Sequence, residues 1–139
     1  MITFLDFHRT IFDTDAYECA VRDGETVDPS AFVYPDAVQA LRSLENNGVV
    51  VTSAAEDFVA SALKHIPRLT ILSTAGMSKE AYLASWPGYY GQTAVFVDDS
   101  PDELVHLTDA HPTLTCVEIR RDGKEGDGRF KVITSLSEL

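Results

Sequence analysis

The sequence predicts an α/β protein, folded as a three-layer α/β/α sandwich with a mostly parallel, Rossmann-like sheet. Short apolar runs bounded by polar residues alternate along the chain with segments whose apolar residues recur at helical spacing. The connections are short, which favours right-handed crossovers and parallel strands with helices on both faces of the sheet. The expected strands cover residues 2–5, 49–51, 69–73, 93–97, 114–119 and 130–133.

Helices are expected between these strands, beginning at Pro35, Phe58, Ser78 and Ser100, with a terminal helical turn over 135–139. Pro35 suits the first turn of its helix, and Gly48 suits the left-handed position that follows a helix. Pro67 and the pair Pro87-Gly88 are expected to end the second and third helices. Residues 14–34 have no clean period, so a partly helical flap or a loop is expected there.

The composition indicates one globular domain over residues 1–139, with 45% hydrophobic residues, enough for a single core. The net charge of −11 argues against nucleic acid as a partner, because a phosphate backbone would be repelled unless a local basic patch or bound cations intervene. Cys19 and Cys116 lack metal-type spacing and the N-terminus lacks a secretory signal, so we expect a reduced, cytoplasmic protein. No apolar run approaches the roughly 20 residues that span a bilayer, so no membrane partner is expected.

Polar side chains follow three of the expected strands. Asp6 comes after the first, Thr52 after the second, and the pair Asp98-Asp99 after the fourth. The carboxyl ends of parallel strands meet at one edge of a sheet, where open α/β folds place their chemistry. Asp6 there can be a nucleophile, a metal ligand or both, or it can only cap the segment that follows. Thr52, taken alone, can simply end a strand.

The pair Asp98-Asp99 is harder to explain structurally, because two adjacent carboxylates after a buried strand repel each other unless a cation lies nearby. Asp102 and Glu103, by contrast, follow Ser100-Pro101 and have a sufficient explanation as helix N-terminal acids. Lys79 is a candidate cation for the site. A lysine in the first helical turn is more often a solvated surface group, and Lys64 is the competing candidate.

These residues resemble the motifs of the haloacid dehalogenase-like hydrolases. The first motif of that family, a strand followed by Asp-x-Asp-x-Thr, resembles Asp6-Phe7-His8-Arg9-Thr10. The second, a strand ending in Thr or Ser, resembles Val49-Val50-Val51-Thr52. The third is a lysine, here Lys79, and the fourth resembles Val95-Phe96-Val97-Asp98-Asp99. Each motif alone is weak, but four in the right order along nearly the whole chain are specific.

The resemblance implies a phosphohydrolase with Mg²⁺ as its cofactor. Asp6, the backbone carbonyl of His8 and Asp99, with Asp98 beside them, would hold the ion, since magnesium prefers oxygen ligands. Asp6 would attack phosphorus to give an aspartyl-phosphate, which water then hydrolyses. Thr52 would hydrogen-bond a phosphoryl oxygen, and Lys79 would pair with the phosphoryl group and the nucleophile.

His8 departs from the family pattern, because phosphatases of the family carry a second Asp at this position. That Asp protonates the leaving group and later activates water. Histidine can do both in principle, because its unperturbed pKa is near 6.5, and we expect surrounding carboxylates to favour its charged form. The substitution leaves two hypotheses: a phosphatase that uses His8, or a phosphatase-like domain that binds a phosphorylated ligand or protein partner without efficient turnover.

The chain also lacks room for the cap domain that family members acting on small metabolites carry. Residues 14–34 and 54–78 are the two places where a cap would be inserted, and both are short. We therefore expect an open site. Such a site suits a phosphorylated macromolecule, or a smaller substrate if a neighbouring subunit supplies the missing wall.

Overall fold

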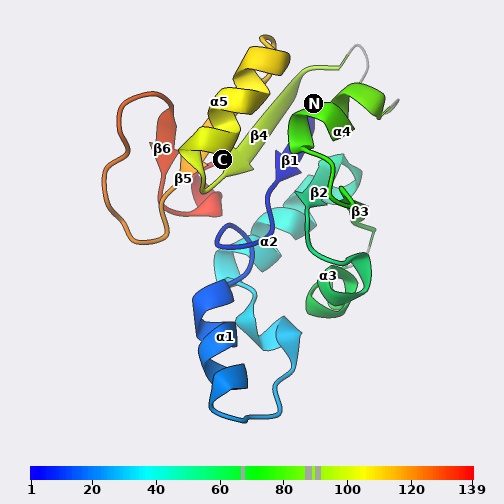
Figure 1. Ribbon diagram of the computed structural model, residues 1–139, viewed down its shortest axis with the longest axis vertical. Coiled ribbons are helices and arrows are strands. Elements are labelled where there is room, and N and C mark those ends of the chain that lie inside the picture. The colour runs from blue at the N-terminus through cyan, green and yellow to red at the C-terminus, as the bar shows by residue number, and fades with distance from the viewer. Residues whose placement is uncertain (67, 87–88, 90–91) are drawn as a thin grey trace.

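The computed structural model, which describes residues 1–66, 68–86, 89 and 92–139, contains a six-stranded parallel sheet in the order β3-β2-β1-β4-β5-β6. Because β1 lies between β2 and β4, the first strand of the chain is central, as Figure 1 shows. The predicted strands are all present, with ends that differ by one residue in most cases. Their bounds are β1 (Ile2–Leu5), β2 (Gly48–Thr52), β3 (Thr70–Ser73), β4 (Ala94–Asp98), β5 (Thr115–Ile119) and β6 (Lys131–Ile133).

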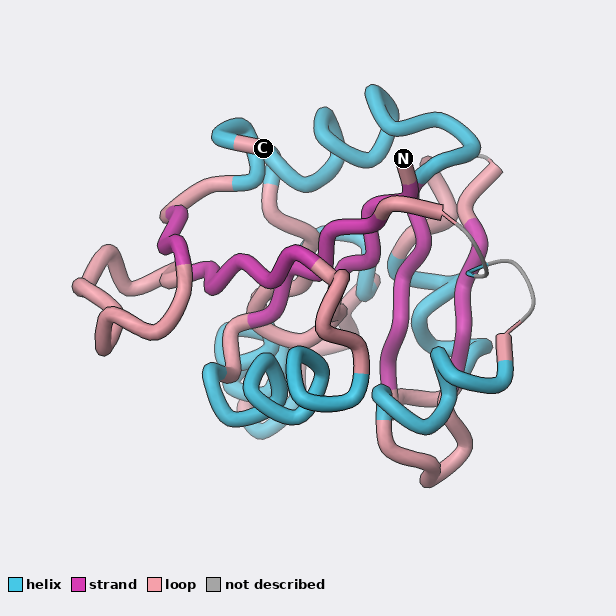
Figure 2. Tube along the Cα trace, turned by 90° about the horizontal axis from the view of Figure 1, so that it is seen from above, coloured by secondary structure: helices cyan, strands magenta, loops and turns pink. Residues whose placement is uncertain are grey.

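Helices lie on both sides of the sheet, which confirms the three-layer prediction (Figure 2). In the described residues the α-helices are α1 (Thr14–Arg22), α2 (Pro35–Leu44), α3 (Glu56–Ala62), α4 (Lys79–Ser85) and α5 (Pro101–Ala110). Short 3-10 turns are η1 (Pro29–Phe32), η2 (Glu45–Asn47) and η4 (Leu136–Glu138). None of these helices is long and apolar enough to cross a bilayer, within the part of the chain described.

The two faces of the sheet have separate cores, and alternate residues of each strand enter them. In β1, Phe4 packs with the apolar residues of α4 and α5, whereas Leu5 packs with those of α2 and α3. Both side chains are fully buried. This alternation decides to which face the residue after each strand points, and so positions the site.

Local sequence signals account for most helix starts. The hydroxyl of Ser100 accepts a hydrogen bond from the backbone N–H of Glu103 and caps α5, as predicted, and Ser78 caps α4 in the same way. The prediction for Gly48 is wrong. Its φ is −89°, not left-handed, and it begins β2 after η2. A Cβ at this position would lie 3.2 Å from the Cβ of Leu44, so close approach explains the glycine better than backbone conformation does.

The segment 14–34, expected as a partly helical flap or a loop, contains α1 and η1 and projects beyond the carboxyl edge of the sheet (Figure 1). Asp13 caps α1 by accepting a hydrogen bond from the N–H of Ala16. Tyr17 then packs between the rings of Phe12 and Phe58. The expected helix ends at Pro67 and Pro87-Gly88 lie outside the described residues.

Arg121, the second residue after β5, ties three parts of the molecule together. Its guanidinium donates two hydrogen bonds to the backbone carbonyl of Thr10, at 3.2 and 2.6 Å, and two to the carboxylate of Asp36, at 3.0 and 2.8 Å. It also stacks on Tyr34, 3.9 Å from the ring centre. We call this group of Arg121, Asp36, Tyr34 and the Thr10 carbonyl the arginine clamp.

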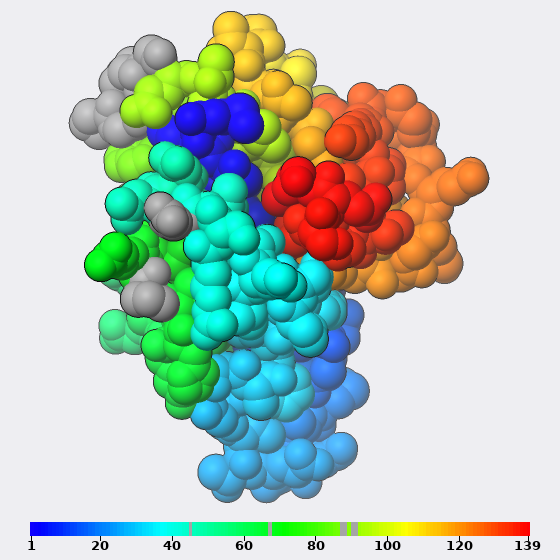
Figure 3. All heavy atoms as spheres, turned by 180° about the vertical axis from the view of Figure 1, so that it is seen from behind, coloured from blue at the N-terminus to red at the C-terminus, as the bar shows by residue number. Residues whose placement is uncertain are grey.

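The clamp also holds the last turn of the chain. The carboxylate of Asp36 accepts hydrogen bonds from the Ser135 hydroxyl and the Leu136 N–H, at 3.1 and 2.7 Å. Figure 3 shows these C-terminal residues lying against α2 on the back of the molecule. Arg121 therefore holds the loop that follows β1, and Asp36 links Arg121 to the C-terminal segment.

Candidate active site

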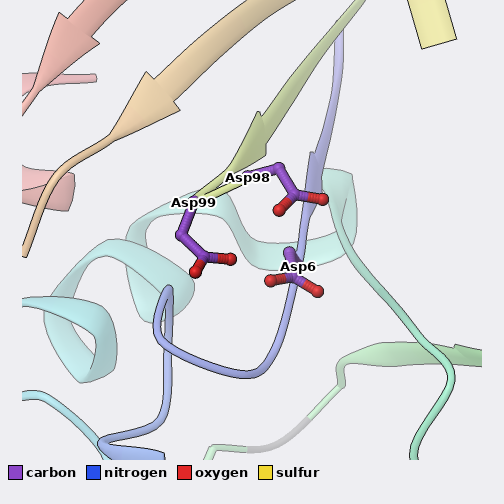
Figure 4. A group of neighbouring side chains, drawn as sticks. All are labelled: Asp6, Asp98 and Asp99. Atoms are coloured by element: carbon purple, nitrogen blue, oxygen red, sulfur yellow. The ribbon is translucent and has the colours of Figure 1, made fainter. Parts of the chain in front are cut away.

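Three carboxylates gather at the carboxyl edge of the sheet, on the two central strands (Figure 4). The pairing of Phe4 with Phe96 places Asp6 beside Asp98, and both follow the strand positions that face α4 and α5. Asp6 and Asp98 are almost fully buried, whereas Asp99 is partly exposed. Of the strand ends that the sequence predicted to converge, those carrying Asp6 and Asp98-Asp99 therefore lie together.

Lys79, the first residue of α4, brings a cation to two of these carboxylates. Its Nζ lies 2.7 Å from Asp6 Oδ1 and 2.8 Å from Asp98 Oδ2, and only 12% of its side chain is exposed. Lys79 is thus not the solvated surface group that its helix position allows. Lys64, the competing candidate, forms an exposed ion pair with Asp28 instead.

The cluster carries more negative charge than Lys79 neutralises. Burial raises the pKa of Asp6 to about 6, and the charge of Asp99 adds to the rise, although Lys79 opposes it. Burial and the charge of Asp6 likewise raise the pKa of Asp98 to about 6. Burial alone would lower the pKa of Lys79, but the charges of Asp6 and Asp98 raise it, so its ammonium stays protonated. One ammonium among three carboxylates leaves a local demand for positive charge.

The donor set fits a hard divalent cation. Asp6, Asp98 and Asp99 each offer a carboxylate oxygen, and these atoms lie within 4.8 Å of one another. Magnesium binds such oxygens and keeps several waters. Because Asp99 is partly exposed, solvent can reach the cluster and supply these waters. The raised pKa of Asp99, caused by burial and then by Asp98, also indicates an uncompensated negative site.

The two threonines have different surroundings. Thr10, in the loop after β1, is fully buried, and its hydroxyl donates a 3.4 Å hydrogen bond to Asp6 Oδ2. Thr52 ends β2 at the same edge, but its hydroxyl accepts a bond from the N–H of Ala54 at 3.0 Å. By strand alternation it shares a face with Val50 and not with Asp6. The predicted role of Thr52 stays a prediction.

His8 lies half-buried beside the cluster, two residues after Asp6. Its Nδ1 is 2.8 Å from the hydroxyl of Thr14, and its ring packs edge-on against Phe7. The Thr14 hydroxyl also lies 3.4 Å from the carbonyl of Phe12. If Thr14 donates to that carbonyl, Nδ1 donates to Thr14 and Nε2 carries the lone pair.

The expectation that carboxylates would favour charged His8 is wrong. Burial lowers the pKa of His8, and the positive charge of Arg9 lowers it further. Glu18 raises it by less than either of these effects, and Lys79 adds a still smaller lowering. The sequence shows the acids Asp6, Asp98 and Asp99 but not the burial of the imidazole, which has the largest effect on its pKa. The neutral ring is the favoured form.

Sequence reasoning missed the residues that line a pocket beside Asp99. Arg9, Arg120 and Arg121 converge there from the loop after β1 and from the end of β5. Two adjacent arginines directly after a predicted buried strand were the available signal.

Three solved structures resemble this one over most of its length. A protein from Burkholderia xenovorans LB400, described as a haloacid dehalogenase-like hydrolase, has 15% identity and a TM-score of 0.73 over 99% of this chain and 93% of its own. The HAD domain of the Legionella pneumophila effector protein Lem4 has 14% identity and a TM-score of 0.61, covering 99% of this chain and 90% of its own. The UTR4 protein of Saccharomyces cerevisiae has 14% identity and a TM-score of 0.58, covering 90% and 64%.

No family model and no curated protein matches the sequence. At these identities the structural likeness concerns the fold. The chain has the haloacid dehalogenase-like fold, which is the fold that its four motifs resembled.

Proposed function

We propose that the protein is a Mg²⁺-dependent phosphohydrolase that acts through an aspartyl-phosphate on Asp6. The observation that carries the proposal is the Lys79 ammonium held between the carboxylates of Asp6 and Asp98, with Asp99 beside them. An anionic nucleophile can approach an anionic phosphate only where positive charge compensates both. The haloacid dehalogenase-like fold supports a hydrolase but leaves the reaction open.

Asp6, Asp98 and Asp99 would hold the Mg²⁺, together with the backbone carbonyl of His8 that the family resemblance implies. When bound, the ion supplies positive charge that compensates the phosphoryl oxygens.

In the first step, a carboxylate oxygen of Asp6 attacks phosphorus, and the leaving oxygen departs with the electron pair of the broken P–O bond. Lys79 stays protonated and stabilises the charge that develops between nucleophile and phosphoryl group. Thr10 donates to the other Asp6 oxygen and fixes the orientation of the carboxylate. Thr52 is proposed to donate its hydroxyl proton to a phosphoryl oxygen.

In the second step, water attacks the phosphorus of the aspartyl-phosphate, which restores Asp6 and releases phosphate. His8 is proposed to donate a proton to the leaving oxygen in the first step and to accept the proton of water in the second. Its neutral form suits the second task better than the first.

We infer further that residues 1–139 form one domain without a cap and that the site is open to a phosphorylated macromolecule, or to a smaller substrate enclosed by a second subunit. The short α1–η1 segment, where a cap would be inserted, supports this. The net charge argues against nucleic acid, and we propose a cytoplasmic location from the two free cysteines.

The test is hydrolysis of aryl phosphate monoesters with and without Mg²⁺. Asp6→Asn should lower kcat/KM by at least about 1,000-fold, because the nucleophile is lost. Asp109→Asn, which changes an exposed carboxylate at the far end of α5, is the matched control and should leave kcat/KM unchanged. Turnover that persists without divalent metal, or in Asp6→Asn, would contradict the proposal.

The second candidate function is binding of a phosphorylated ligand without efficient turnover. It is favoured by His8, whose lowered pKa makes it a poor donor to a leaving group at neutral pH. His8→Ala should slow alkyl esters, whose leaving groups need a proton, more than activated aryl esters if His8 is the acid. If the wild type is inert while His8→Asp gains Mg²⁺-dependent turnover, the binding function is the correct one.

A further inference from the structure

A pocket of about 310 Å³ opens beside Asp99, the most exposed carboxylate of the cluster. It lies where the loop after β1, the first turn of α1 and the end of β5 meet. The charged and aromatic residues that line it are Arg9, Asp15, Tyr34, Asp99, Arg120, Arg121 and Asp122.

Three arginines line this pocket together with three aspartates, in a chain that has few basic residues. Only 11 lysines and arginines face 22 acids in the sequence, yet Arg9, Arg120 and Arg121 all line this one pocket. Arg121 is committed to the arginine clamp, where Thr10, Asp36 and Tyr34 occupy its guanidinium. Arg9 and Arg120 are the two that can serve a ligand.

Hydrogen bonds to Glu118 and Asp122 hold the guanidinium of Arg120 in place. Its Nη1 donates to Oε2 of Glu118 at 3.3 Å, and its Nε and Nη2 donate to Asp122 at 3.3 and 3.0 Å. Glu118 is fully buried, and its other oxygen has no hydrogen-bond partner in the described part of the chain. A guanidinium has more N–H donors than these contacts use, so Arg120 presents remaining donors at a fixed position.

Arg9 is the adjustable partner. It adopts φ 60°, a left-handed conformation, in the loop that directly follows the proposed nucleophile, and half of its side chain is exposed. Its contact is an ion pair of 3.0 Å with Asp15, whose side chain is 72% exposed. Such exposed pairs contribute little to stability, so Arg9 can exchange Asp15 for a ligand.

We propose that this pocket receives an anionic substituent on the leaving group of the substrate, a carboxylate or a second phosphate, bound by Arg9 and Arg120. The inference rests on the proposed phosphohydrolase function, because Asp99 places the pocket next to the scissile phosphate. Asp15 and Asp122 already have arginine partners, and Asp99 faces the proposed metal, so the groups left to meet a substituent are N–H donors.

The experiment compares 3-carboxyphenyl phosphate with 3-carbamoylphenyl phosphate, which has the same shape without the charge. With Mg²⁺, 3-carboxyphenyl phosphate should have a kcat/KM about 10-fold higher than that of the carbamoyl compound, which is the effect of one charge-assisted hydrogen bond. Arg9→Gln and Arg120→Gln should each bring that ratio down toward one. Arg129→Gln, an exposed arginine that pairs with Asp127 elsewhere, should leave the ratio unchanged.

Asp15→Asn supplies a variant with the opposite sign. It releases Arg9 without altering the buried Glu118, and the carboxylate preference should rise by about 2- to 5-fold, since only a weak surface ion pair is removed. Arg120→Gln removes the partner of the buried Glu118 and can fail to fold. Asp15→Asn still tests the proposal in that case. An unchanged ratio in both Arg9→Gln and Asp15→Asn would overturn the proposal.

Binding gives a readout that does not need turnover. Calorimetry on the wild type with (3-carboxyphenyl)methylphosphonate, which cannot be hydrolysed at its P–C bond, should show about 10-fold tighter binding than the carbamoyl analogue. Equal affinities, or a preference for 3-(aminomethyl)phenyl phosphate over both esters, would overturn the pocket proposal while leaving the phosphohydrolase intact. Loss of all Mg²⁺-dependent hydrolysis with the affinity preference retained would overturn the phosphohydrolase and support an anion pocket.

Discussion

The arginine clamp and the carboxylate cluster lie at the same edge of the sheet, but they differ in how far their charges are balanced. In the arginine clamp, one cation meets one anion, and Asp36 accepts four hydrogen bonds from Arg121, Ser135 and Leu136. In the carboxylate cluster, one ammonium meets three carboxylates, and the pKa of Asp6, raised mainly by burial, shows that its ionised form is unfavourable there.

The difference separates a structural ion pair from a functional one. The surroundings of Asp36 lower its pKa despite burial, through Arg121 and the N–H of Leu136, so folding favours its ionised form. The surroundings of Asp6 and Asp98 do the reverse. Excess negative charge that the fold maintains without compensating it is typical of a site that awaits a cation.

Among the changes that separate the carboxylate cluster from the clamp, removing the cation of the cluster should have the largest effect. Lys79→Ala should lower kcat/KM on aryl phosphates by about 100- to 1,000-fold, the usual effect of losing one electrostatic contact to a transition state. It should also destabilise the fold by about 3 kcal/mol, because Asp6 and Asp98 lose their buried partner. Urea unfolding and steady-state kinetics measure the two effects.

Lys64→Ala is the control for that variant. Lys64 pairs with Asp28 in solvent, so turnover should not change. A loss of turnover in Lys64→Ala, with Lys79→Ala fully active, would show that the site lysine is misassigned.

Breaking the clamp should affect stability instead of chemistry. Asp36→Ala leaves the guanidinium of Arg121 without its anion and frees the Leu136 N–H, which should cost about 2 to 4 kcal/mol in the free energy of unfolding. Asp109→Ala on the exposed face of α5 should change it by less than about 0.5 kcal/mol. Equal unfolding midpoints for the two variants would show that the clamp does not stabilise the fold.

Added Mg²⁺ should distinguish the two groups directly. At a concentration about ten times the dissociation constant, the ion should stabilise the protein by about 1.4 kcal/mol, and Tm should rise by a few degrees. Asp99→Ala should abolish the rise, whereas Asp36→Ala should keep it because its carboxylate does not contribute to the cluster. A rise of the same size in Asp99→Ala would contradict the proposed metal site.

The smallest effect is the acid dependence of the clamp. The pKa of Asp36 is lower in the folded protein than the usual value of about 3.9 in an unfolded chain, so its stabilising contribution is complete above that value. The contribution should be lost as pH falls through the folded pKa. The stability difference between wild type and Asp36→Asn should therefore shrink in acid, measured by urea unfolding at a series of pH values.

The sequence predicted what depends on periodicity and on strand ends. Buried apolar runs located the strands, and their order implied that Asp6 and Asp98 would meet although 92 positions separate Ile2 from its partner Ala94. The capping signature at Ser100 and Glu103 was equally local. Lys79 could be chosen over Lys64 only through the resemblance of the motifs.

What the sequence could not predict depends on which faces meet in space. Arg121 and Asp36 are 85 positions apart and carry no motif, so nothing local marks the clamp. Residues 14–34 could be predicted only as a partly helical flap or a loop, and α1 was not located within them; Thr14 alone among its residues is buried. The pKa of His8 is lowered mainly by its burial, which the sequence does not show, whereas the nearby acids in the sequence indicated a raised pKa.

The central position of β1 also sets when the site can form during folding. β1 precedes β2 and β4 in the chain, and it needs β2 on one side and β4 on the other before its backbone is fully paired. Pairing of such distant segments closes long loops and is slow. We therefore expect Asp6 to meet Asp98 and Asp99 late in folding, and the apolar strand that carries it to have an open edge until then. A chaperone that shields this strand during synthesis should raise the yield of folded protein more than one that acts on the finished chain.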